Sequence, residues 1–140
     1  MLGGVVQVDV ADVVVHAGGQ GKGERVTTNA ARKARGMRTQ KVVAQWFQTH
    51  GFPHAESTGS GRAGVDILGL PGFAVEVKAR RDLALTAWLR QAAKESRVGL
   101  PVVIHRPDGF GEVSIAAWPV TMTLSDFTVL IREAGYGEEL

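Results

Sequence analysis

The sequence predicts an α/β fold in which a mixed central β-sheet is flanked by helices. Two observations favour this class. Two segments repeat their apolar residues at helical spacing, and short β-rich segments are separated by Gly and Pro turn signals. The hydrophobic share of 44% is that of a globular chain. A chain of 140 residues fits one domain of ordinary size. The expected order of elements is helix, three strands, helix, two strands and helix, or αβββαββα.

The first predicted helix covers residues 39–50, where apolar side chains follow the helical period. Thr39 is its expected N-cap, and Gly51 is expected to end it. Residues 1–38 are predicted to be an N-terminal arm, a possible strand followed by a basic linker. Residues 39–140 form the predicted folded domain.

A β-hairpin is predicted after a short strand at residues 54–58. Its two strands are 65–70 and 73–78, and Pro71-Gly72 is the turn signal between them. The remaining predicted elements are a helix over 83–97, strands over 102–105 and 112–118, and a short helix capped by Ser125 that ends near Gly135.

The charge of the chain is unevenly distributed. Residues 22–106 hold 15 Lys and Arg against 6 Asp and Glu, a balance of +9. Residues 1–21 contribute −2 and residues 107–140 contribute −5, which returns the net charge of +2. A basic centre suits a polyanionic partner, and the alternative is an ordinary solvated surface.

Cysteine is absent, which excludes disulfide scaffolds, cysteine nucleophiles and cysteine zinc sites. The chain has neither a long apolar run nor the pattern of a signal peptide. We therefore expect a soluble protein without a membrane partner. Its expected location is the cytoplasm of a bacterial or phage-infected host cell.

Charged residues interrupt the two apolar strands of the predicted hairpin. Because side chains alternate along a strand, Val75 and Val77 face one side while Glu76 and Lys78 face the other. Asp66 lies on the neighbouring strand and can face them. Two nearby carboxylates repel each other unless a cation joins them, and oxygen ligands suit Mg²⁺ or Mn²⁺. Asp, Glu and Lys together are a set that suits phosphodiester hydrolysis, and the alternative is a solvated pair beside a turn-proximal acid.

The segment resembles the PD-(D/E)XK nuclease superfamily, whose motif is an Asp, a hairpin spacer and then Glu-x-Lys. The region from Thr39 to His105 further resembles archaeal-type and phage Holliday junction resolvases. It has their Gly-Phe stop at Gly51-Phe52 and their Ser-Gly-rich loop at residues 59–62. The resemblance implies a restriction-endonuclease-like core that cuts branched DNA.

The resemblance also implies residue roles. Asp66 and Glu76 would be ligands of Mg²⁺, for which Mn²⁺ can substitute, with the Val77 carbonyl as a third ligand and Lys78 as the catalytic lysine. Gln40 stands near the position where the resolvases usually have a metal-binding Glu, and Glu56 is the alternative ligand. Gln91 would hold the scissile phosphate or order a metal-bound water; the alternative is a solvated helix face.

Basic and polar residues around this motif are candidate contacts to the DNA backbone, which give affinity without sequence preference. They are Ser60, Arg62, Arg80, Arg81, Arg35, Arg38, Lys41 and Lys94.

The expected function is a Mg²⁺-dependent endodeoxyribonuclease, acting on branched or junction DNA as a homodimer. One alternative is a nuclease with the same core that acts in restriction, repair or on RNA. Another is a DNA-binding module without catalysis, and a third is an assembly protein whose basic arm neutralises nucleic acid.

Overall fold

The computed structural model describes residues 28–59 and 64–139. Within these residues the helices and strands come in the order αβββαββα, and a 3₁₀ helix lies between the last two strands, where a strand was predicted. They are α1 (Asn29–Thr49), β1 (Glu56–Ser57), β2 (Ile67–Leu68), β3 (Phe73–Lys78), α2 (Leu85–Glu95), β4 (Leu100–His105), the 3₁₀ helix η2 (Glu112–Ala117), β5 (Val120–Thr121) and α3 (Leu124–Glu133).

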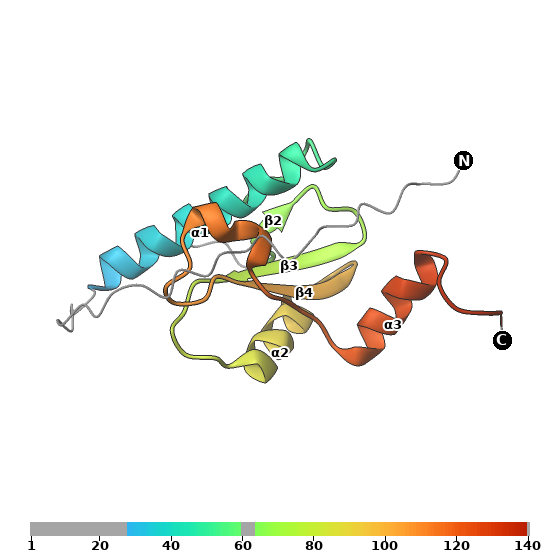
Figure 1. Ribbon diagram of the computed structural model, residues 1–140. Coiled ribbons are helices and arrows are strands. Elements are labelled where there is room, and N and C mark those ends of the chain that lie inside the picture. Colours follow the sequence, from blue (N-terminus) through green and yellow to red (C-terminus); the bar gives the residue numbers. More distant parts are fainter. Residues whose placement is uncertain (1–27, 60–63, 140) are drawn as a thin grey trace.

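The strands form one mixed sheet in the order β1-β2-β3-β4-β5. Only the central pair, β3 and β4, is parallel, and α2 provides the crossover that a parallel pair requires. The other neighbours are antiparallel. Figure 1 shows the sheet between α1 and α2, which confirms the predicted α/β class with a mixed sheet flanked by helices.

The sheet separates two groups of buried side chains. On one face, Val75 and Val77 of β3 pack with Val43 of α1. On the other face, Val103 of β4 packs with Trp88 of α2. The predicted alternation along β3 is therefore confirmed, because its valines share the α1 layer.

Helix α1 begins at Asn29, so the predicted start at Thr39 is wrong. Thr28 is the N-cap, and its side chain accepts a hydrogen bond from the Ala31 N–H at 3.2 Å. Residues 30–35 are all Ala, Arg or Lys, which have high helix propensity and extend the helix toward the N-terminus. Thr39 is instead fully buried, and its hydroxyl donates to the Arg35 carbonyl at 2.8 Å.

The segment predicted as strand 112–118 is the 3₁₀ helix η2, which corrects that expectation. It is not paired in the sheet because its residues pack onto the α1 side of the core. Glu112 forms a two-bond ion pair with Arg38 of α1, and Ile115 packs against the core. The fifth strand comes directly after η2, at Val120–Thr121, and pairs with β4.

Helix α3 is capped by Thr123, whose hydroxyl oxygen accepts the Asp126 N–H at 3.1 Å, and not by Ser125 as predicted. The helix has no buried residue. In Figure 1 it lies apart from the layered body, beyond the end of the sheet. In the described part of the chain, no helix is both long enough and apolar enough to span a membrane.

Candidate active site

The backbone of β3 holds Asp66 in place at the start of β2. The predicted strand 65–70 is reduced to Ile67–Leu68, and Asp66 directly precedes it. Its N–H donates to the Val75 carbonyl at 2.9 Å, and its carboxylate Oδ2 accepts the Val77 N–H at 2.7 Å. These two bonds fix both the main chain and the side chain of Asp66 against β3.

Glu76 and Lys78 face the α2 layer. The Lys78 Nζ donates to Glu76 Oε1 at 2.8 Å and to Gln91 Oε1 at 2.8 Å. Glu76 is only 5% exposed, and the Lys78 side chain is 14% exposed. The ammonium therefore lies between a strand carboxylate and a helix amide and donates to both.

Glu95 extends this chain of hydrogen bonds and was not predicted from the sequence. The Gln91 Nε2 donates to Glu95 Oε1 at 3.1 Å. The two residues lie four apart on α2, a spacing that places side chains next to each other on a helix. That spacing was the available signal, but it does not reveal that the pair faces Lys78.

Burial raises the pKa of Glu76 to about 7, although the hydrogen bond from Lys78 acts in the opposite direction. The neighbouring Asp66 carboxylate raises this pKa further. Burial also raises the pKa of Asp66, against the lowering effects of the Val77 N–H and of Lys78. Glu95 raises both pKa values as well, so three carboxyl groups share this region with one ammonium.

The donor set fits a hard divalent cation held by few protein ligands. Within residues 28–59 and 64–139, no group of three or more His, Cys, Asp or Glu side chains could hold a metal ion. Mg²⁺ commonly uses one or two carboxylates and completes its shell with water and substrate oxygens. Asp66 and Glu76 supply two carboxylates, and a cation between them would relieve their mutual repulsion.

The Val77 carbonyl is directed toward the same side of β3 as Asp66. In a strand, the N–H and C=O of one residue point to the same neighbour, and the Val77 N–H bonds to Asp66. Gln40 makes no hydrogen bond to Asp66 or Glu76, and its buried Oε1 has no partner among the described residues. Its role as a metal ligand stays a prediction. Glu56, the alternative, is exposed on β1.

The predicted nucleic-acid contacts fall into several places. Ser60 and Arg62 lie outside the described residues. Arg35, Arg38 and Lys41 are on α1, and Arg38 is engaged by Glu112.

Arg80 and Arg81 follow β3 and are exposed. The Arg80 carbonyl accepts the His105 Nε2–H at 3.0 Å. Arg81 pairs with Asp108 at 3.2 Å. Lys94 lines an open groove of about 1070 Å³ between α2 and β2, together with two basic residues that were not predicted, Arg90 and Arg97.

Comparison with known proteins identifies no relative of this chain. The chain matches no family model, and no curated protein or solved structure is significantly similar to it.

Proposed function

We propose that this protein is a metal-dependent endonuclease of the PD-(D/E)XK type that hydrolyses DNA phosphodiester bonds. The observation that carries the proposal is the convergence of Glu76, Lys78 and Gln91 beside a carboxylate, Asp66, that is fixed by β3. A structural ion pair alone does not explain why two carboxyl groups with raised pKa values share one buried region.

Asp66 and Glu76 would hold Mg²⁺, and the Val77 carbonyl is oriented to contribute. When bound, the ion would polarise the scissile phosphate and lower the pKa of a bound water. In the reaction, a water oxygen forms a new bond to phosphorus, one ester P–O bond breaks, and the leaving oxygen takes up a proton. Lys78 then stabilises the negative charge that develops on the phosphate oxygens, or orients the attacking water.

Gln91 has a positioning role in this proposal. Its Oε1 accepts from Lys78 while its Nε2 donates to Glu95, so the ammonium cannot rotate away without breaking a bond. A preorganised cation contributes more to catalysis than a mobile one because no reorganisation is needed during the reaction. Glu95 supports Lys78 indirectly, through Gln91.

The polyanionic substrate is supported by the basic centre of the chain and by α1, which has basic residues and no acidic one. A preference for branched DNA follows from the sequence resemblance, as does action as a homodimer, which would place two cuts symmetrically. Analytical ultracentrifugation measures the oligomeric state directly.

A substrate panel tests the proposed function. Labelled four-way junctions, matched linear duplex, single-stranded DNA and single-stranded RNA are incubated with wild-type protein and Mg²⁺, Mn²⁺ or EDTA. Cleavage with either metal and none with EDTA is the expected result, with the junction cut fastest.

Three other outcomes change the conclusion in different ways. Equal cleavage of all DNA substrates keeps the nuclease and removes junction selectivity. Cleavage of RNA alone would mean that the substrate is RNA and not DNA. Binding without any cleavage by folded protein overturns the nuclease and leaves a DNA-binding module.

A further inference from the structure

A groove leads away from the candidate active site between α2 and the β2 edge of the sheet. Gln91 of α2 lines it, and so do Val65 and Ile67, which flank Asp66. Phe73 and Val98 line it as well. Because Gln91 accepts a hydrogen bond from Lys78, a ligand that reaches Gln91 in this groove would lie next to the candidate catalytic lysine.

One wall of the groove is basic. Arg90 and Lys94 lie one helical turn apart on α2, and Arg97 follows just after the helix ends. All three are exposed, and in the part of the chain that the structure describes none of them forms an ion pair. Among the described residues that line the groove, Glu95 is the one acidic side chain, and it is hydrogen-bonded to Gln91. The wall therefore presents three cations that are available to an anionic ligand.

The floor of the groove is apolar. Leu68 is 49% exposed there although it belongs to a strand. Phe73, Ile67 and Leu70 also line the groove, but they pack into the core cluster that includes Val75, where Phe73 is partly buried and the other two are buried. A duplex would offer this floor its charged backbone, whose desolvation an apolar surface does not compensate. The unpaired bases of a single strand can bury against apolar side chains while their phosphates meet the basic wall.

We propose that this groove binds a single-stranded DNA segment of about three nucleotides, one for each cation of the wall, with the end of the segment at Lys78. The catalytic end of this proposal rests on the proposed nuclease function, while the binding itself does not. It implies that the preferred substrate has an unpaired strand next to the cut, as splayed arms of branched DNA do.

Binding is measured by fluorescence anisotropy with full-length protein in EDTA, so that no cleavage is needed. The probes are a labelled oligothymidine of about 12 nucleotides and a duplex of equal length, several times longer than the groove segment. Leu68→Gln removes apolar contact without changing charge, and Leu124→Gln on α3 is the matched control, since Leu124 is 81% exposed outside the groove. The expected result is a reduction of about three- to ten-fold in single-strand affinity for Leu68→Gln, with duplex affinity and the control unchanged.

A second set of variants tests the basic wall. Simultaneous Arg90→Ser, Lys94→Ser and Arg97→Ser substitutions should weaken single-strand binding at least about ten-fold and reduce its salt dependence. The control is the same reduction of charge outside the groove, through Arg32→Ser, Lys33→Ser and Arg132→Ser, which should have a smaller effect on the single strand.

Equal reductions of single-strand affinity in both triple variants would overturn the groove proposal, because they would mean that total charge alone controls binding. Unchanged binding in Leu68→Gln and in the groove triple would overturn it as well. If wild-type protein cuts no substrate but these variants behave as expected, the groove proposal is supported and the nuclease proposal is wrong. If cleavage occurs and the groove variants bind normally, the nuclease proposal is supported and the groove proposal is wrong.

Discussion

At the scale of single residues, the most informative group is Glu76. It is a carboxyl group in the centre of β3 with 5% exposure, and one ammonium, that of Lys78, contacts it. A buried ion pair is weak evidence for stability, because removing two charges from water offsets most of their attraction. We therefore interpret this ion pair as part of a functional site and not as a contribution to folding stability.

The raised pKa of Glu76 predicts a specific pH dependence of stability in metal-free protein. The pKa of Glu76 is about 7 in the folded state and near 4.5 in the unfolded state. The stabilisation that the folded state gains from protonation of Glu76 is therefore fully present below about pH 4.5 and is lost as pH rises through about 7. Between about pH 5 and about pH 8, wild-type protein should lose on the order of 1–3 kcal/mol more unfolding free energy than Glu76→Gln. Urea titrations across this range measure it.

The control for this measurement is Glu133→Gln on α3, where the glutamate is exposed. Its pH profile should run parallel to that of wild-type protein. Parallel profiles for Glu76→Gln as well would contradict the assignment of a raised pKa to Glu76.

Gln91 provides a second prediction at this scale. Gln91→Ala should lower the single-turnover cleavage rate about 10- to 100-fold while changing duplex affinity by less than about two-fold, because the residue orients Lys78. The matched control is Gln45→Ala, an exposed glutamine on α1. A rate unchanged by Gln91→Ala would remove the positioning role, and a reduction confined to affinity would convert Gln91 into a binding residue.

The sequence was sufficient to predict Asp66, Glu76 and Lys78 as neighbours, because alternation in a hairpin fixes which side chains share a face. It was not sufficient for Glu95, Arg90 and Arg97. Their position depends on how α2 is rotated and placed on the sheet, and this is decided by the packing of Trp88 and Ala92 against Val103. Helical periodicity indicates an inner face but does not locate the strand residues that it meets.

At the scale of elements, the segments bounded by strong turn signals were predicted well. Strand β3 was predicted with its observed bounds, since Pro71-Gly72 precedes it, and the Phe73 N–H closes that turn on the Leu70 carbonyl at 3.1 Å. Helix α1 and η2 were predicted less well. Basic, alanine-rich residues are equally compatible with a linker and with a helix, and an apolar segment that packs over the core resembles a strand.

Helix α3 is an element that the layered body does not require. None of its residues is buried, and Leu124 and Phe127 are exposed. A chain truncated after Thr123 should therefore have an unfolding free energy within about 1 kcal/mol of the full-length protein, because only surface contacts are removed. For comparison, Val103→Ala in the centre of the sheet should cost about 2 kcal/mol.

Thermal or urea unfolding of these two variants beside wild-type protein tests the distinction. A truncated chain that unfolds as easily as Val103→Ala would mean that α3 is part of the cooperative core. A truncated chain that also retains cleavage would place the active site wholly in the layered body.

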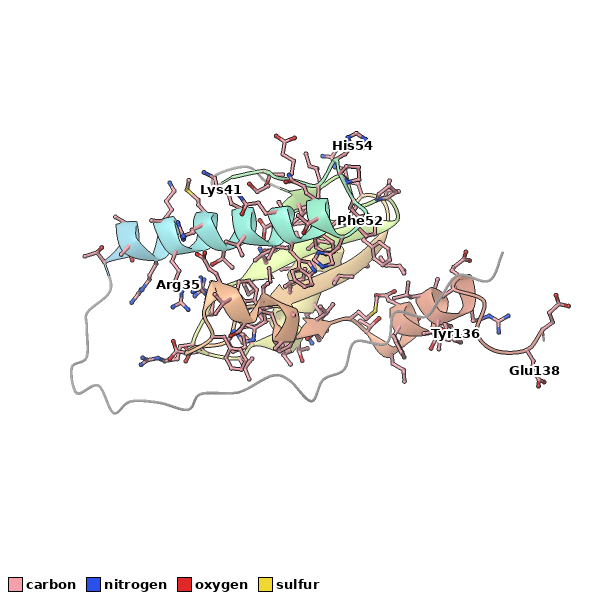
Figure 2. The ribbon with its side chains drawn as sticks, turned by 45° about the horizontal axis from the view of Figure 1, so that its top comes forward. Arg35, Lys41, Phe52, His54, Tyr136 and Glu138 are labelled. Carbon is pink, nitrogen blue, oxygen red and sulfur yellow. The ribbon has the colours of Figure 1, made fainter. Side chains whose placement is uncertain are left out.

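At the scale of the whole molecule, charge is separated along the long axis. Figure 2 shows Arg35 and Lys41 on α1 at one end and Tyr136 and Glu138 beyond α3 at the other. Helix α1 has no acidic residue in its 21 positions. A polyanion would therefore be attracted to the α1 end and repelled from the C-terminal end, which orients it before any specific contact forms.

This polarity predicts the salt dependence of duplex binding. Replacing Arg35 and Lys41 with Ser should make the slope of log K against log salt shallower by about 0.9 for each DNA phosphate that the protein no longer neutralises. Anisotropy titrations between low and moderate salt measure the slope, with Arg132→Ser on α3 as the control. An unchanged slope in the double variant would mean that Arg35 and Lys41 of α1 do not contact the DNA.

The proposed function requires that Asp66, Glu76 and Lys78 act together as a metal-dependent phosphodiesterase centre. The most direct test is the single-turnover cleavage rate of the best DNA substrate in Mg²⁺, measured for wild type, Asp66→Asn, Lys78→Ala and the exposed control Glu133→Gln. We expect a reduction of about 10²- to 10⁴-fold in the first two variants, with folding and DNA binding retained, and an unchanged rate in the control. Metal-dependent cleavage that persists in Asp66→Asn and Lys78→Ala would contradict it.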